Sequence, residues 1–163
     1  MAERWVLNAS PLIVLAKINH QHLLTQLADE IVIPQAVLAE INAGPTGDPA
    51  RQFLATSPFL VVEAAPDPLV VAWDLGAGEV AVLSHTFTHR GWTAVVDDGA
   101  ARRCARALGI PLLGTLGLVL RARLAGHIPA AVPVLQAIQA QGFRLDDEVI
   151  RLVLWQTVGE SWE

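Results

Sequence analysis

Short apolar runs alternate with amphipathic stretches along the whole chain of 163 residues. The runs are rich in valine, isoleucine and leucine and are bounded by glycine, proline or charged residues, a pattern typical of buried strands. We therefore predict strands over residues 5–7, 31–33, 60–63, 93–96 and 110–113.

Between these runs, apolar residues recur three and four positions apart, as they do on the buried face of a helix. Ser10 and Thr115 are expected to cap the helices that follow them, and Gly109 and Gly126 are expected to end helices. The predicted helices cover residues 11–18, 22–27, 34–41, 49–56, 68–73, 76–89, 99–108, 115–125, 131–141 and 146–156.

Strands that alternate with one or two helices favour a parallel sheet with helices on both faces. The expected fold class is therefore α/β, a three-layer α/β/α sandwich with a central parallel sheet. No repeat, low-complexity segment or linker divides the chain, so residues 1–158 are expected to form a single domain. We expect residues 159–163 to be a loose carboxyl-terminal tail.

The composition describes a compact chain with a large core, since 53% of the residues are hydrophobic and the mean hydropathy is +0.43. No apolar run is long enough to span a bilayer, and Glu3 and Arg4 make the first residues a poor signal peptide. The single cysteine, Cys104, cannot form an internal disulfide, which fits a reducing compartment. We therefore expect a cytoplasmic protein without a membrane partner.

The net charge of −5 argues against a broad electrostatic grip on nucleic acid. It does not exclude a nuclease, because metal-binding carboxylates are counted in the same total. Lys17 is the only lysine, so phosphate contacts would be local and made mostly by arginine, whose fork can bind two oxygens.

Two adjacent carboxylates, Asp97 and Asp98, follow the predicted strand 93–96 directly. Open parallel sheets bind their ligands at the carboxyl ends of strands, and a pair of acids there repels itself unless a cation or protons intervene. Mg²⁺ or Mn²⁺ is the simplest partner. For Asp98 an N-cap of the following helix is an equally good interpretation.

Glu79, Glu40 and Asn8 are further candidates, each with an ordinary structural alternative. Glu79 lies beside two glycines in the first turn of a predicted helix, where a glutamate also interacts well with the helix dipole. Glu40 borders an apolar stripe, as surface residues often do. Asn8 follows the first strand and would serve equally well as a turn residue. His85 and His89 have helical spacing but lack the glutamate of a zinc-protease helix.

Short motifs spread over most of the chain together resemble the PIN-domain family, specifically a PIN-like subfamily related to VapC-type toxins. In chain order they are Leu7-Asn8-Ala9-Ser10-Pro11-Leu12-Ile13, Glu40, Leu75-Gly76-Ala77-Gly78-Glu79, Val96-Asp97-Asp98 with Ala101-Arg102, and Leu113-Gly114-Thr115-Leu116-Gly117. The resemblance implies a ribonuclease that hydrolyses phosphodiester bonds in single-stranded RNA with bound Mg²⁺ or Mn²⁺. It also implies a homodimer and, for the toxin of a toxin–antitoxin pair, a small antitoxin protein as partner.

Carried over residue by residue, the resemblance implies a catalytic cluster of Asn8, Glu40, Glu79 and Asp97, with Asp98 as a further metal ligand. Ser10 and Thr115 would be supporting polar groups. Arg102 or Arg106 would clamp a neighbouring phosphate, although a solvated helix face is the alternative for both.

The family pattern usually has aspartate where this chain has Asn8. The site is therefore one negative charge poorer, and its metal affinity should be lower. A second hypothesis is a nuclease-attenuated or inactive PIN fold that binds RNA or a protein partner. A third is a regulatory subunit that docks through exposed Trp155 and Trp162, although Trp155 would equally well pack the final helix.

Overall fold

Five parallel strands form one sheet in the computed structural model, which describes residues 2–57 and 59–163. In chain order the strands are β1 (Arg4–Leu7), β2 (Glu30–Pro34), β3 (Leu60–Val62), β4 (Thr93–Val95) and β5 (Leu112–Leu113). Their order across the sheet is β3-β2-β1-β4-β5. After β1, the chain adds β2 and β3 on one side of β1 and then β4 and β5 on its other side. The crevice beyond β1 and β4 is the topological switch point, where such sheets bind ligands.

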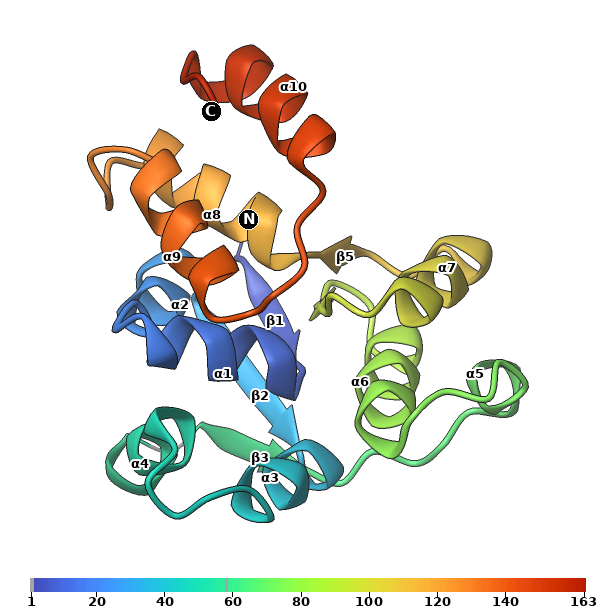
Figure 1. Ribbon diagram of the computed structural model, residues 1–163. Coiled ribbons are helices and arrows are strands. Elements are labelled where there is room, and N and C mark those ends of the chain that lie inside the picture. Colours follow the sequence, from blue (N-terminus) through green and yellow to red (C-terminus); the bar gives the residue numbers. More distant parts are fainter. Residues whose placement is uncertain (1, 58) are drawn as a thin grey trace.

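Helices cover both faces of the sheet, which confirms the expected three-layer α/β/α architecture (Figure 1). In chain order they are α1 (Ala9–Lys17), α2 (His22–Leu27), α3 (Gln35–Asn42), α4 (Pro49–Thr56), α5 (Pro68–Val71), α6 (Ala77–Thr88), α7 (Gly99–Leu108), α8 (Thr115–Leu124), α9 (Val132–Ala140) and α10 (Asp147–Val158). One face carries α1, α2, α4 and α8, and the other carries α6 and α7. Both α9 and α10 pack on α8.

The central strand β1 is buried on both sides, as expected for a parallel sheet between two helical layers. Trp5, Val6 and Leu7 are completely buried, and Val6 lies opposite Val32 of β2 and Ala94 of β4. The backbone N–H of Asn8 donates to the carbonyl of Val95 at 3.1 Å. This bond fixes the carboxyl ends of β1 and β4 side by side, so the residues that follow them are neighbours in space.

Two expected helix caps are placed differently. The helix α1 begins at Ala9, so Asn8 rather than Ser10 precedes it, because Asn8 is still extended and bonded to β4. Gly114 precedes α8, and Thr115 is its first residue. The Thr115 hydroxyl is engaged elsewhere, as described below. No helix among the described residues is long and apolar enough to cross a membrane.

The carboxyl-terminal residues are not loose, contrary to our expectation. The Glu160 carboxylate accepts hydrogen bonds of 3.0 Å from the backbone N–H groups of Ala131 and Val132, at the start of α9. Trp162 is only 6% exposed, and its indole N–H donates to Asp147 at 2.9 Å. A carboxylate that satisfies the free amides of a helix start, and an indole buried beside α10, hold this segment against the domain.

Candidate active site

Asp97 is the most firmly held acid at the carboxyl edge of the sheet. Its Oδ1 accepts a hydrogen bond from the backbone N–H of Thr115 at 2.7 Å, and its Oδ2 accepts one from the Thr115 hydroxyl at 2.6 Å. Thr115 is itself completely buried. Because both oxygens are engaged by one residue of α8, the carboxylate has a fixed orientation. Thr115 was predicted as a helix cap and as a supporting polar group, and its contact with Asp97 agrees with the second role.

The charged form of Asp97 is costly where it lies. Burial raises its pKa above the ordinary value, even though the two Thr115 hydrogen bonds and the nearby Arg102 charge act in the opposite direction. Hydrogen bonds and one cation therefore do not fully replace the water that the carboxylate has lost. A further positive charge in front of Asp97 would stabilise the ionised form.

Arg102 turns into the site and does not lie on a solvated helix face. Its Nη1 donates to the carbonyl of Val96 at 3.2 Å. A Cβ atom placed on Gly114 would lie 2.5 Å from this nitrogen and 3.2 Å from Asp97 Oδ1, so only glycine leaves room for the guanidinium beside the carboxylate. By contrast, Arg106 is exposed and lies outside the lining of the cavity described below.

Asn8 and Glu40 meet at the first turn of α6. A Cβ atom placed on Gly78 would lie 2.8 Å from Glu40 Oε2 and 3.3 Å from Asn8 Oδ1, so both oxygens point at a glycine that has no side chain to fill the space. Asn8 is only 3% exposed, and its Oδ1 has no hydrogen-bond partner among the described residues. A buried carbonyl oxygen without a partner is rare and costs free energy.

Glu79 interacts with Glu40 and lines the same cavity as Asn8 and Asp97. Burial, followed by the negative charge of Glu79, raises the pKa of Glu40, so the two glutamates are close enough to repel each other. Glu79 also lines a cavity of about 660 Å³ together with Asn8 and Asp97. Asn8, Glu79 and Asp97 therefore lie around one hollow at the switch point, whereas Glu40 is exposed and lies beside Asn8, outside the lining of that hollow.

The same cavity contains most of the predicted site residues. Its polar lining includes Asn8, Ser10, Glu79, Asp97, Asp98 and Arg102. The Asp98 carboxylate accepts a hydrogen bond from the backbone N–H of Ala101 at 2.9 Å, so the N-cap interpretation is confirmed. One oxygen of Asp98 accepts this bond, and Asp98 also lines the cavity.

The connector between α9 and α10 forms a wall of the cavity that sequence reasoning missed. Phe143, Arg144, Leu145 and Asp146 line it opposite Asp97 and Glu79. Figure 1 shows this connector passing beside α1 and the start of α8 before it reaches α10. Nothing in the local sequence indicates that a segment so far from the motifs folds back over them.

The donor set suits a hard divalent cation. All the candidate ligands offer oxygen, and Asn8 Oδ1, which is buried and has no hydrogen-bond partner among the described residues, adds a neutral donor beside Glu40. Within the described residues, no three histidine, cysteine, aspartate or glutamate side chains already form a metal-binding group. The oxygen donors fit a divalent cation in general, because a hard ion such as Mg²⁺ is commonly held by one or two carboxylates and completes its shell with water and substrate oxygens.

His85 and His89 take no part in this site. Their rings stack on each other with centroids 3.9 Å apart, and His89 Nδ1 lies 2.8 Å from the carbonyl of His85. They occupy the carboxyl-terminal end of α6, whereas Glu79 lies at its start.

Comparisons with known proteins agree with the fold. The solved structure titled "Structure of the PIN domain endonuclease Utp24" matches with a TM-score of 0.52 and 15% sequence identity, covering 68% of this chain and 84% of that chain. No curated protein matches the sequence. The family model DUF3368, described as PIN domain, matches residues 4–160, which is nearly the whole chain. The chain is therefore a member of the DUF3368 family of PIN domains.

Proposed function

We propose that this protein is a metal-dependent ribonuclease that hydrolyses phosphodiester bonds in single-stranded RNA. The observation that carries the proposal is the meeting of Asn8, Glu79 and Asp97 in one cavity at the switch point of the sheet, with Glu40 beside Asn8. These oxygens come from four separate parts of the chain. The similarity to a solved PIN domain endonuclease supports the same activity.

Each residue has a role in the proposed site. Asp97, Glu79, Glu40 and Asn8 would hold Mg²⁺ or Mn²⁺, and Asp98, which also lines the cavity, would add a carboxylate oxygen. The ion, when bound, activates a water and offsets the charge that builds up on the scissile phosphate. Thr115 keeps Asp97 in one orientation. Arg102 places a guanidinium at the cavity, where it can bind a phosphate oxygen of the substrate.

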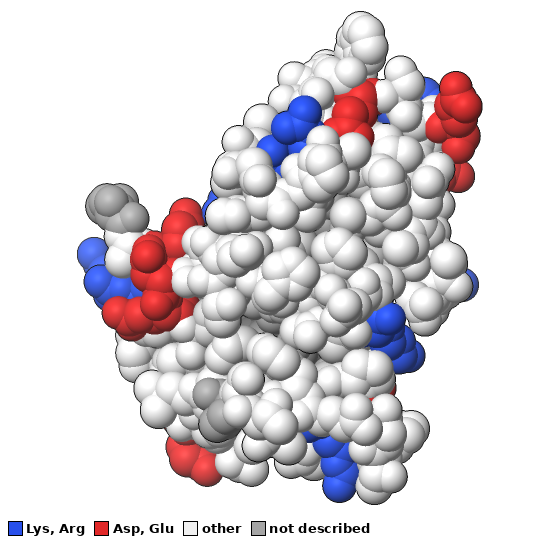
Figure 2. Space-filling view, turned by 90° about the vertical axis from the view of Figure 1, so that its left-hand side faces the viewer, with Lys and Arg blue, Asp and Glu red and all other residues white. Residues whose placement is uncertain are grey.

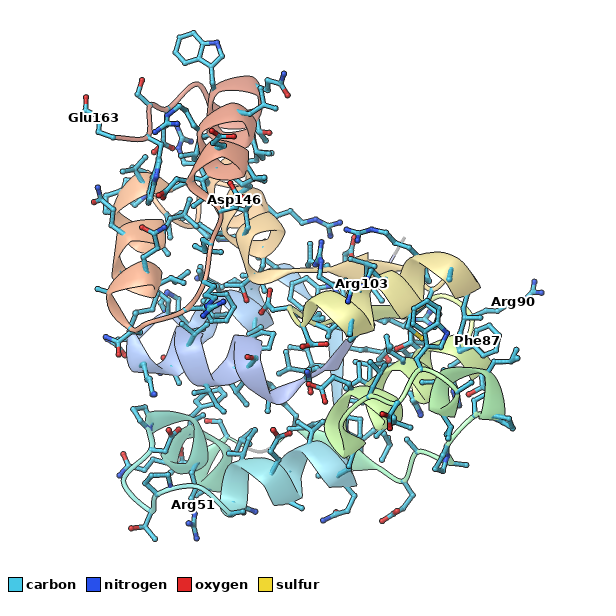
Figure 3. All side chains as sticks on the ribbon, turned by 45° about the vertical axis from the view of Figure 1, so that its right-hand side comes forward. Arg51, Phe87, Arg90, Arg103, Asp146 and Glu163 are labelled. Carbon is cyan, nitrogen blue, oxygen red and sulfur yellow. The ribbon has the colours of Figure 1, made fainter. Side chains whose placement is uncertain are left out.

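The proposal is tested by cleavage of an unstructured RNA with and without Mn²⁺. We expect cleavage that EDTA abolishes and that Glu79→Gln reduces by at least about 100-fold, since removing even an outer partner of a metal ligand typically costs 10–100-fold. Arg90→Gln is the control, because Arg90 lies beyond the far end of α6, away from Asp146 and the connector (Figure 3). Activity that survives EDTA, or equal activity of Glu79→Gln and wild type, would refute the assignment.

The nuclease-attenuated binding module is the second candidate, and Asn8 favours it. With asparagine at this position the cluster contains one carboxylate fewer than the usual family pattern. Such a protein would still bind RNA or a protein partner through the same cavity. Substitution of Asn8, argued in the Discussion, separates the two candidates.

We propose that α10 is the surface through which two copies of the chain associate. Val149, Leu152 and Trp155 are 48%, 58% and 68% exposed and follow one another at a spacing of three residues. Trp162, which we had grouped with Trp155, is buried and so does not contribute. Large apolar side chains on one exposed helix face are typical of interfaces.

Trp155→Arg is expected to convert the dimer into a monomer, measured as solution mass by light scattering. The charge would be desolvated in the interface, whereas in the monomer Trp155 faces water. Arg90→Glu is the surface control, because Arg90 is exposed and lies beyond the far end of α6. A wild-type protein that is monomeric at all accessible concentrations would refute the dimer. If the protein is monomeric, the exposed face of α10 would instead bind an antitoxin that silences a cytoplasmic toxin.

A further inference from the structure

We propose that α1 and the connector between α9 and α10 form a groove for a single RNA strand leading away from the acids. In this groove an unpaired base stacks on Phe143, and flanking phosphates contact Lys17 and Arg144. The inference rests on the proposed ribonuclease function and specifies how that site takes its substrate.

Three hollows adjoin one another along the connector, and Phe143 lines all three. The first is the cavity of about 660 Å³ that contains Asp97 and Glu79. The second, of about 520 Å³, lies over Arg144 and Asp146. The third, of about 180 Å³, lies between the connector and α1 and is lined by Ser10 and Lys17. Ser10 also lines the first hollow, so the hollows beside the acids and beside Lys17 share Ser10 and Phe143 as lining residues.

Lys17 and Arg144 form no ion pair with a described carboxylate. The ion pairs among residues 2–57 and 59–163 are Arg4–Glu30, Arg121–Glu3 and Arg123–Glu160, all outside the groove. Lys17 and Arg144 are both exposed. The net charge is −5, and the face in Figure 2 carries scattered charges of both signs without a broad basic patch. A few unpaired cations beside the acids are therefore well suited to local phosphate contacts.

Phe143 offers a surface for a base. Its side chain is half-buried, packed against the core on one side and lining the hollows on the other. An aromatic ring held in this way can stack with any unpaired base, and a base in a duplex is unavailable for such a contact. The groove therefore predicts single-stranded specificity.

The test is the binding of a fluorescently labelled, unstructured RNA in Mg²⁺, followed by anisotropy, with every protein carrying Glu79→Gln so that the RNA stays intact. Phe143→Leu keeps apolar volume but removes the aromatic face, and should weaken binding by about 5- to 160-fold, the range for one base–aromatic stack. Phe143→Tyr should bind like the parent. If Phe143 had only a structural role, Phe143→Leu would bind the RNA more tightly than Phe143→Tyr.

Lys17→Gln tests the groove independently of Phe143 and changes only an exposed side chain. We expect weaker binding and a slope of log K against log salt reduced by about 0.7, as for one lost phosphate contact on a single strand. Arg90→Gln should change neither. The parent should bind the same sequence as a duplex much more weakly.

The groove is overturned if Phe143→Leu binds as tightly as the parent, if Lys17→Gln and Arg90→Gln behave alike, or if duplex RNA binds equally well. Absence of RNA binding in every variant overturns it too. These outcomes are distinct from failure of the ribonuclease proposal. Cleavage by wild type with binding indifferent to Phe143 refutes the groove alone, and Phe143-dependent binding without cleavage refutes the nuclease alone.

Discussion

Asp97→Asn is expected to reduce metal-dependent RNA cleavage by more than about 100-fold while leaving the fold intact. The amide has the shape of the carboxylate, and its Oδ1 can still accept the Thr115 backbone hydrogen bond while its Nδ2 donates to the Thr115 hydroxyl. It lacks the negative charge that a divalent ion requires. Loss of an outer partner costs 10–100-fold, and loss of a direct ligand should cost more. Cleavage rates of the two proteins in Mn²⁺ measure the effect.

The same substitution should increase stability in the absence of metal, and increasingly so as the pH rises. In the folded protein the pKa of Asp97 is raised by burial. Between its ordinary value and this raised value, the unfolded chain loses a proton that the folded chain keeps. Wild type therefore loses stability as pH rises through that window and stays less stable above it, whereas the amide does not titrate. Denaturant unfolding of both proteins from pH 4 to 7 measures the difference.

Two results would contradict this account of Asp97. Equal cleavage by both proteins would remove Asp97 from the site. A stability difference that does not change with pH would mean that its carboxylate is not desolvated. Thr115→Val is a useful companion, because it leaves the charge but removes the bond to Oδ2. It should lower activity by roughly 10- to 100-fold, as expected for a partner that orients a ligand.

Local sequence signals predicted the elements of this fold well because their causes are local. The helix over 49–56 begins with Asp48 as its cap and Pro49 in its first turn, and the structure places it at the same residues. Gly109 ends α7 in a left-handed conformation with φ of 68°. Both features depend on backbone groups within a few residues, which a single sequence displays directly.

The neighbourhood of Asn8 and Asp97 was predictable for a different reason. In a parallel sheet the carboxyl ends of all strands lie along one edge, so residues that directly follow strands are brought close whatever the details of packing. The pairing of β1 with β4 makes these two residues neighbours.

Side-chain contacts made outside a residue's own helix were not predictable from periodicity. Arg102 lies on the polar side of α7, but its long side chain reaches back to the carbonyl of Val96. Thr115 has the sequence context of a helix cap, yet its hydroxyl binds an acid 18 residues away. The hydrogen bonds between the Glu160 carboxylate and the start of α9 likewise depend on how α8, α9 and α10 pack together.

Asn8→Asp is expected to increase metal affinity by at least about tenfold, equivalent to roughly 1.4 kcal/mol. That is a small part of the Coulomb energy between a divalent ion and a new carboxylate in contact with it. The reason lies in Asn8 Oδ1, which is buried, unpartnered and directed with Glu40 Oε2 at the space above Gly78. Without metal the variant should be less stable than wild type, because it places a negative charge at a buried position beside Glu40.

Thermal unfolding with and without Mn²⁺ measures both effects, since a ligand that binds only the folded state raises the melting temperature. Without Mn²⁺, the melting temperature of Asn8→Asp should be lower than that of wild type. Added Mn²⁺ should raise the melting temperature most for Asn8→Asp and least for Asn8→Ala. If cleavage rises together with the metal-induced shift, the natural protein is an attenuated nuclease restrained by its asparagine. If the shift is the same in all three proteins, Asn8 does not face the ion. The cluster would then consist of Glu79 and Asp97, with Glu40 acting only as their neighbour.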